Sequence, residues 1–185
     1  MSARPPVDRE RIAYFLKQLG ERFRRPGRVY LVGGTTMVFE GFRRQSLDID
    51  LTFEVQPQDH AAFIQTVRVL KDELSINVEQ VSPGDFIPLP SGYRERSRFI
   101  GRYGQLDVFH FDLYCTALSK IERGTAEDFS DVLALLRDGQ IEMDALETYF
   151  AEILPCFATA SLKRDPDEFQ KKFVALKQMW RSESR

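Results

Sequence analysis

Asp48 and Asp50 are the two side chains whose type and spacing most directly suggest chemistry in this sequence. They lie in the alternating run LDIDLTFEV over residues 47–55, a pattern that predicts a β-strand. Side chains two residues apart on a strand share a face, with Cα atoms about 6.6 Å apart, so the two carboxylates are expected side by side. Two such carboxylates repel each other unless a cation lies between them, and their hard oxygens suit Mg²⁺. The plainer interpretation is a solvent-facing strand with ordinary polar alternation.

A glycine pair, Gly33-Gly34, lies about 14 residues before these aspartates. It ends a short apolar run and begins a predicted helix, for which Thr35 is the expected cap. A turn of this kind offers free backbone N–H groups and the positive end of a helix, where a phosphate can bind. Thr35 or Thr36 would add a hydroxyl, and so would Ser46, just before the aspartates. Together these residues predict a phosphate cradle and a metal site at one sheet edge, although a lone strand–Gly-Gly–helix turn more often reflects tight packing.

The segments that must position these residues alternate between helical and strand periodicity. Helices are predicted over 7–23, 35–44 and 57–74, and strands over 28–32, 47–55 and 76–81. A hairpin follows over 98–103 and 105–111, and then only helices, over 112–123, 126–138, 143–153 and 166–181. This order predicts an α/β (α+β) fold, with a mixed sheet, flanking helices and a C-terminal helical tail. We expect an N-terminal helix within 1–27, a central domain over 28–138, and an extension over 139–185 packed on the same domain.

Composition excludes several other classes of protein. The 185 residues carry 26 basic and 28 acidic side chains, a net charge of −2, which excludes a histone-like or ribosomal coat and an acidic solvating chain. Two cysteines and two histidines without metal-ligand spacing do not predict a structural zinc site. The sequence contains no membrane-spanning run, signal peptide, G-x-S-x-G elbow or Walker P-loop, so a cytoplasmic protein is expected.

The glycine pair, the short helix and the run Ser46-Leu47-Asp48-Ile49-Asp50-Leu51 resemble the signature of the DNA polymerase β-type nucleotidyltransferase superfamily. Within it, residues 117–123 and 127–132 resemble the helical K…R…D..D motif of a small bacterial group related to AbiEii-type toxins, and residues 85–100 resemble that group's connecting segment. The likeness covers residues 28–138 and implies a nucleotidyltransferase-like fold.

The resemblance also implies roles for individual residues. Asp48 and Asp50 would hold Mg²⁺, and Lys120 would neutralise the phosphates of the nucleotide. Asp128 or Asp131 would orient Lys120 or the incoming hydroxyl. The expected nucleotide-binding residues are Gly33, Gly34, Thr35, Ser46, Arg96 and Lys120.

Two further expectations concern the hairpin region. Polymerases of this superfamily usually bring a third carboxylate from a later strand, and Asp107 is the candidate by position, whereas Asp112 is expected to cap a helix. Arginines interleaved with aromatic residues could bind a triphosphate or an RNA end, and Arg96 or Arg98 is the expected phosphate ligand. The cluster comprises Arg94, Arg96, Arg98 and Arg102. Its plainer interpretation is a solvated hairpin face whose aromatic residues fill the core.

These features predict a Mg²⁺-dependent nucleotidyltransferase that moves an NMP from an NTP to a macromolecular hydroxyl, at a tRNA or other RNA end or on a protein side chain. The relatives imply the toxin of a toxin–antitoxin or phage-defence pair, with a cognate antitoxin as partner. The alternative is a catalytically inactive nucleotide- or antitoxin-binding module of the same fold. A small-molecule transferase, which would need a closed acidic acceptor pocket, is a third possibility.

Overall fold

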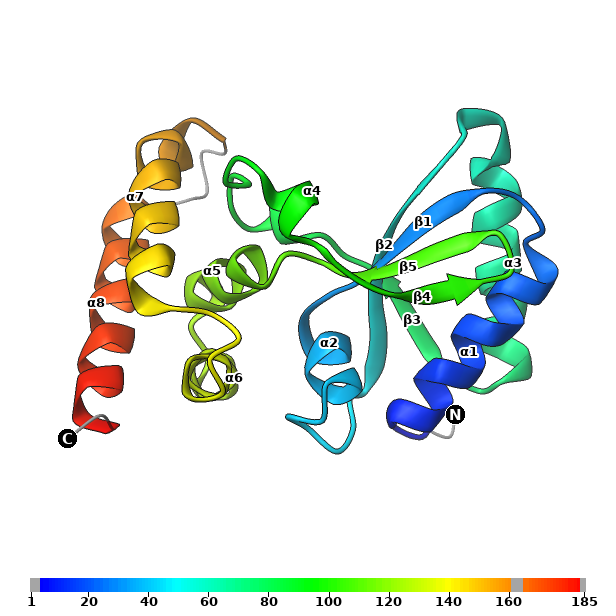
Figure 1. The fold of residues 1–185 in the computed structure, drawn as a ribbon, viewed down its shortest axis with the longest axis horizontal. Coiled ribbons are helices and arrows are strands. Elements are labelled where there is room, and N and C mark those ends of the chain that lie inside the picture. The colour runs from blue at the N-terminus through cyan, green and yellow to red at the C-terminus, as the bar shows by residue number, and fades with distance from the viewer. Residues whose placement is uncertain (1–3, 161–164, 184–185) are drawn as a thin grey trace. The chain divides into compact units, whose positions relative to one another are not determined.

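The computed structural model describes residues 4–160 and 165–183 of the chain (Figure 1). Contacts between residues divide the chain into two compact units, of which the first is Met1–Ser82 with Ser97–Phe111 and the second is Pro83–Arg96 with Asp112–Arg185. These units do not coincide with the predicted ranges 1–27, 28–138 and 139–185. The N-terminal helix shares a unit with the strands, and the β-hairpin is assigned to a different unit from the helices that follow it.

The first unit contains a five-stranded mixed sheet with the strand order β3-β2-β1-β5-β4. Its strands are β1 (Gly27–Leu31), β2 (Asp48–Val55), β3 (Asn77–Gln80), β4 (Arg98–Tyr103) and β5 (Leu106–His110). β1 pairs antiparallel with β2 and parallel with β5, β2 pairs parallel with β3, and β4 and β5 form the predicted antiparallel hairpin. The predicted α/β class, with a mixed sheet and flanking helices, is confirmed.

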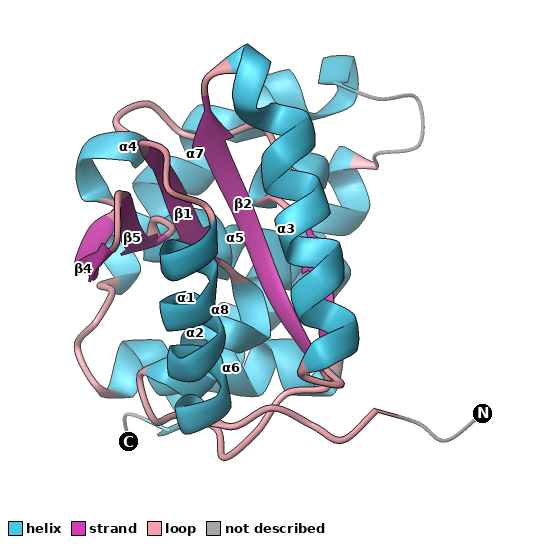
Figure 2. Cartoon of the chain, turned by 90° about the vertical axis from the view of Figure 1, so that its right-hand side faces the viewer, coloured by secondary structure: helices cyan, strands magenta, loops and turns pink. Residues whose placement is uncertain are grey.

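One face of this sheet carries the hydrophobic core of the first unit. In Figure 2, α1 (Arg9–Arg22) and α3 (His60–Glu73) lie side by side in front of the strands. The apolar residues that alternate along the central strands share a buried cluster with these helices; it includes Ile12, Phe15, Leu16, Leu19, Val29, Leu31, Ile49, Leu51, Phe63, Leu70, Leu106 and Val108. Leu47, the first residue of the predicted strand 47–55, lies before the first residue of β2 and is 72% exposed. The residues between the core positions, including Asp48 and Asp50, therefore point to the opposite face.

Two glycines allow α1 to approach the β4–β5 turn closely. A Cβ atom added to Gly20 would lie 2.3 Å from the carbonyl oxygen of Tyr103, and one added to Gly104 would lie 2.3 Å from the carbonyl oxygen of Gly20. Gly104 also has a φ of +61°, which favours glycine. The glycine that weakens the last turn of α1 is thus required by packing.

The second unit is helical. It contains the short helix α4 (Tyr93–Arg96), which was not predicted, followed by α5 (Leu113–Arg123), α6 (Ala126–Arg137), α7 (Met143–Ala160) and α8 (Pro166–Glu183). Asp112 caps α5 as predicted, because its carboxylate accepts a hydrogen bond from the N–H of Tyr114. Aromatic residues of α8 pack on α7: the ring of Phe173 stacks on Phe150 and that of Phe169 on Phe157, with centroids 4.0 and 4.6 Å apart.

No helix within residues 4–160 and 165–183 combines the length and the apolar character needed to cross a membrane.

Candidate functional site

The two aspartates of β2 lie where the start of this strand meets the end of β1. The N–H of Val32, the residue after β1, donates to the carbonyl oxygen of Asp50 at 3.1 Å. Ile49 between the aspartates is fully buried, so the two half-buried carboxylates lie on the opposite face of the sheet from the core. This is the paired arrangement that the D-x-D spacing predicts.

The glycine pair lies directly against these residues. Gly33 has a φ of +55°, and a Cβ atom there would lie 3.3 Å from Oδ2 of Asp50. A Cβ atom on Gly34 would lie 3.1 Å from Oγ of Ser46. The structure therefore brings Gly33, Gly34, Ser46 and Asp50 together, and the missing side chains allow Asp50 and Ser46 to approach the backbone of this turn closely.

The helix that follows differs from its prediction. α2 (Gly33–Phe39) begins at Gly33 with Val32 as its N-cap, so the prediction that Thr35 caps it is wrong, and it ends before residue 44. The predicted contact of the Thr35 hydroxyl with a nucleotide is not supported either. Thr35 is fully buried, and its Oγ1 accepts from the N–H of Asp50 at 2.7 Å and donates to the carbonyl oxygen of Asp48 at 3.4 Å. Thr35 is a positioning residue that holds the backbone of both aspartates.

A second long-range contact fixes α2 to the sheet. His110, buried at the end of β5, has Nδ1 3.3 Å from the hydroxyl of Thr36 and Nε2 2.6 Å from a carboxylate oxygen of Glu40. Burial lowers the pKa of His110 to about 4, and the charges of Arg98 and Arg9 act in the same direction, whereas Glu40 opposes them. No local pattern indicates this contact, because Thr36 and His110 are 74 residues apart in the sequence.

Asp107 does not lie beside the aspartate pair. In the register of the sheet, Asp107 on β5 is level with Arg28 on β1, which is level with Glu54 on β2. That level is four residues from Asp50, about 13 Å along the strand at 3.3 Å per residue. The carboxylate of Asp107 forms two hydrogen bonds with the guanidinium of Arg102, at 2.8 and 3.2 Å. The prediction of Asp107 as a third ligand at this pair is wrong.

The acid that the register places next to Asp50 on the same face is Glu79 of β3. No local pattern indicates Glu79, because β3 is a short strand and the sequence does not show with which strand it pairs. Among the described residues, no group of three or more His, Cys, Asp or Glu side chains is arranged to hold a metal ion. The donor set is thus a carboxylate pair, which suits Mg²⁺ because this ion is commonly held by one or two carboxylates together with substrate phosphates.

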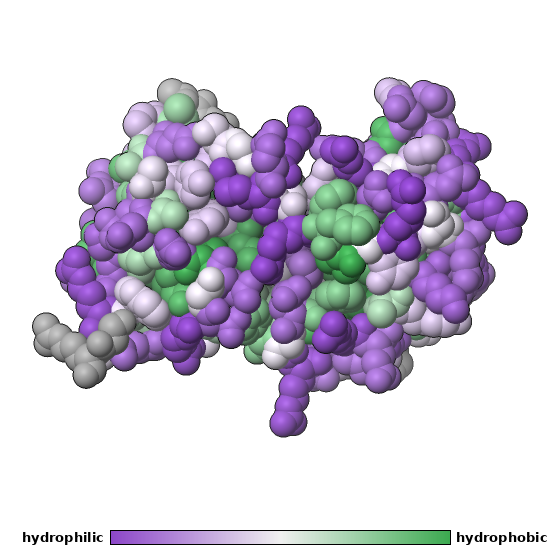
Figure 3. All heavy atoms as spheres, viewed as in Figure 1, coloured by the Kyte–Doolittle hydropathy of each residue, from purple (hydrophilic) through white to green (hydrophobic). Residues whose placement is uncertain are grey.

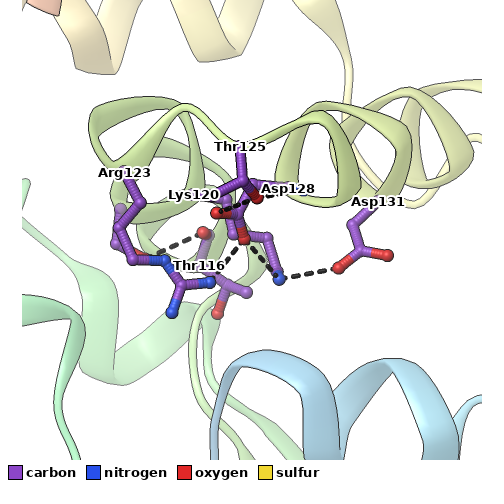
Figure 4. Close-up of polar contacts among 7 residues, drawn as sticks. Thr116, Lys120, Arg123, Thr125, Asp128 and Asp131 are labelled. Atoms are coloured by element: carbon purple, nitrogen blue, oxygen red, sulfur yellow. Dashed lines mark hydrogen bonds and ion pairs between the residues drawn. The ribbon is translucent and has the colours of Figure 1, made fainter.

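A separate cluster of charged residues lies in the second unit, where α5 meets α6 (Figure 4). Lys120, 1% exposed, has its Nζ 2.7 Å from Asp131 and 3.2 Å from Asp128, and both aspartates are buried. Arg123 contacts Asp128 at 2.5 Å, and the hydroxyl of Thr125 donates to the same carboxylate at 2.8 Å. The sequence left Asp128 and Asp131 as alternatives, and in the structure both contact Lys120.

The environment of Asp128 favours its charged form. Burial raises the pKa of Asp128, but the hydrogen bond from Thr125 and the charges of Lys120 and Arg123 outweigh burial and leave the pKa below its ordinary value. The hydroxyl of Thr116, one helical turn before Lys120, is buried without a hydrogen-bond partner in the described part of the chain. Lys120 is therefore held in one position by two carboxylates.

Arg96, predicted to bind phosphate, forms hydrogen bonds with residues of the second unit instead. Its guanidinium donates two hydrogen bonds to Oδ2 of Asp112, at 2.7 and 3.0 Å, and a third to the carbonyl oxygen of Ser91 at 2.7 Å. It also lies over the ring of Tyr149, 4.2 Å from the centroid. These contacts occupy the planar fork, so the structure gives Arg96 a structural role. The predicted arginine cluster is divided, since Arg94 and Arg96 belong to α4 whereas Arg98 and Arg102 belong to β4.

The mixed sheet, with a D-x-D strand beside a strand–Gly-Gly–helix turn, defines a nucleotidyltransferase-like domain. The family model described as a nucleotidyltransferase of unknown function (DUF6036) matches residues 10–181. The chain therefore belongs to this family. Neither the curated proteins nor the solved structures include a match to the chain.

Proposed function

We propose that this protein is a Mg²⁺-dependent nucleotidyltransferase that transfers an NMP from an NTP to a hydroxyl group of a macromolecule. The observation that carries the proposal is the carboxylate pair of Asp48 and Asp50 on one face of β2, with Asp50 lying against Gly33 of the glycine turn. A nucleotide's phosphates need both a cation held by carboxylates and a close approach to backbone N–H groups. In this proposal the two aspartates would hold the cation, and the half-buried glycine turn of the same unit would offer the N–H groups.

The reaction needs positioning and charge neutralisation more than covalent help from the protein. The acceptor oxygen bonds to the α-phosphorus, the bond from the α-phosphorus to the bridging oxygen breaks, pyrophosphate leaves with the electron pair, and the hydroxyl proton passes to water. Mg²⁺ bound by Asp48 and Asp50 would neutralise the developing charge on the phosphates. Thr35 would keep the backbone of the two aspartates in place during this step, since its hydroxyl bonds to both residues.

Lys120, expected to neutralise nucleotide phosphates, is 1% exposed, and its ammonium group already pairs with Asp128 and Asp131 within the second unit. We therefore leave these three residues out of the proposed nucleotide site. The resemblance to the AbiEii-related group supports two finer proposals: the protein is the toxin of a toxin–antitoxin or phage-defence pair, and a cognate antitoxin binds it.

The proposal is tested by a transfer assay with purified protein, Mg²⁺, each α-³²P-labelled NTP, total RNA and total protein. Asp50→Asn is the test variant. Asp72→Asn is the matched control, because it makes the same change in the same unit at a side chain that is 78% exposed and forms a surface ion pair. We expect label on RNA or protein with the wild type and the control, and none with Asp50→Asn.

A thermal-shift measurement separates the enzyme from an inactive module. Mg²⁺ with the preferred NTP should raise the Tm of the wild type, and the shift should disappear in Asp50→Asn. Binding without transfer for any nucleotide would favour a catalytically inactive nucleotide-binding module. Neither binding nor transfer would contradict the proposal.

A further inference from the structure

A row of aromatic side chains crosses the sheet of the first unit. The rings of Phe99 on β4 and Phe109 on β5 have centroids 5.4 Å apart, and Phe109 stacks on Tyr30 of β1 at 5.4 Å. Phe111, just after β5, contacts Tyr30 edge to face at 5.8 Å. Phe99 is 60% exposed, Phe109 is half-buried, and Tyr30 and Phe111 are buried. The exposed end of the row thus lies on the hairpin.

This row lies on the same sheet face as the aspartate pair. Tyr30 and Phe109 are level with Thr52 of β2, which points to the same side as Asp50 two residues before it. Counting two strand spacings of about 4.8 Å and two residues of about 3.3 Å, Phe109 is about 12 Å from Asp50 at the Cα level. The row and the carboxylates therefore lie on one face of the sheet, within one unit.

Arginines accompany the aromatic row. The guanidinium of Arg28 lies over the ring of Phe109, 6.0 Å from its centroid, and the side chain of Arg102 on β4 is 66% exposed. Both arginines line a cavity of about 320 Å³ that Glu54 and Asp107 also line. Asp107 and Arg102 neutralise each other through two hydrogen bonds, which leaves Arg28 as the arginine of this group that lies on the aromatic row. Figure 3 shows green hydrophobic patches interrupted by purple polar side chains on the face that it draws.

We infer that the sheet face formed by Phe99, Phe109 and Arg28 binds the single-stranded RNA end that accepts the nucleotide. The inference rests on the proposed function and selects between its two acceptor classes. An exposed ring with an arginine near it matches an unstacked base joined to phosphates, because bases stack on aromatic faces whatever their sequence and an arginine binds the backbone. A base on Phe99 and Phe109 would place its strand on the same sheet face as Asp50.

The experiment measures binding without chemistry. A 5′-fluorescein-labelled single-stranded octamer of uridine is titrated with the full chain in the absence of NTP, and fluorescence anisotropy gives the Kd. Phe99→Ala is the test variant, and Tyr14→Ala, at a 51% exposed aromatic residue on α1, is its control. Arg28→Gln tests the phosphate contact, and Arg68→Gln, at an exposed arginine on α3, is its control.

Stacking contributes about 1–3 kcal/mol per base, so Phe99→Ala should weaken binding roughly 5- to 150-fold. We expect Arg28→Gln to weaken binding and reduce its salt dependence, both controls to bind like the wild type, and the same sequence in a duplex to bind far more weakly. Equal binding by Phe99→Ala and Tyr14→Ala, equal binding of duplex and single strand, or no RNA binding at all would overturn the inference. Label transferred only to protein would also overturn it, yet would leave the proposed transferase intact. RNA binding without any Mg²⁺-dependent NTP binding would instead remove the proposed function.

Discussion

The sharpest prediction concerns Lys120, the buried lysine where α5 meets α6. Lys120→Met keeps an unbranched side chain of similar length but removes the charge that Asp128 and Asp131 share. The side chain of Lys120 is 2% exposed and those of both aspartates are 6% exposed, so water cannot replace the lost partner. Removing one partner of a buried ion pair costs about 3–5 kcal/mol, because the other charge remains buried.

The effect is measured by urea unfolding, with the fluorescence of the single tryptophan, Trp180 in α8 of the same unit, as the probe. With a slope of about 2 kcal/mol/M, a loss of 3–5 kcal/mol lowers the urea midpoint by about 1.5–2.5 M. Lys177→Met is the control, because the Lys177–Glu147 pair has the same chemistry but side chains that are 24% and 40% exposed. An exposed pair of this kind contributes about 0–1 kcal/mol.

A double variant tests the reason for the loss. Adding Asp131→Asn to Lys120→Met removes the buried carboxylate that has lost its contact with Lys120, while Asp128 keeps its contacts with Arg123 and Thr125. We expect the double variant to recover about 1–3 kcal/mol relative to additive losses. If Lys120→Met destabilises the protein by less than about 1 kcal/mol, as the Lys177→Met control should, the reasoning from burial is refuted.

Four further predictions concern the first unit. Glu79→Gln should weaken the Mg²⁺-dependent thermal shift with NTP without abolishing it, because Glu79 is next to Asp50 in the register; an unchanged Mg²⁺ titration would contradict this. Thr35→Val should lower the free energy of unfolding by about 1–3 kcal/mol, because the N–H of Asp50 loses its acceptor; urea unfolding checks it. Gly20→Ala should destabilise by about 1–3 kcal/mol in the same assay, although alanine favours helices, because its Cβ would meet backbone; a stabilised variant would refute the close approach. Burial lowers the pKa of His110 from near 6.5 to about 4, so on acidification the unfolded chain binds this proton before the folded chain does. The free energy of unfolding should therefore fall by at most about 3 kcal/mol between pH 6.5 and 4. Urea midpoints measured against pH should show this fall in the wild type and not in His110→Gln.

Local patterns in the sequence were sufficient for the elements and for the central motif. Alternation over 47–55 predicted a strand with both aspartates on one face, and the helical spacing of apolar residues predicted α1, α3, α5 and α6 to within a few residues. The glycine pair before this strand predicted the turn that now lies against Asp50. These features depend on residues a few positions apart, so the period of the backbone is enough to infer them.

The tertiary structure decided which distant residues meet. Asp107 and Glu79 are both acids on predicted strands, but only the pairing of β3 with β2 shows that Glu79, and not Asp107, is beside Asp50. Similarly, Arg96 looked like a phosphate ligand until the structure placed Asp112 and Tyr149 against its guanidinium. The amino-acid sequence by itself therefore determined the strand, the glycine turn and the candidate carboxylates. Strand order, register and side-chain pairing were decided only in the folded chain, because they arise from packing between segments far apart in sequence.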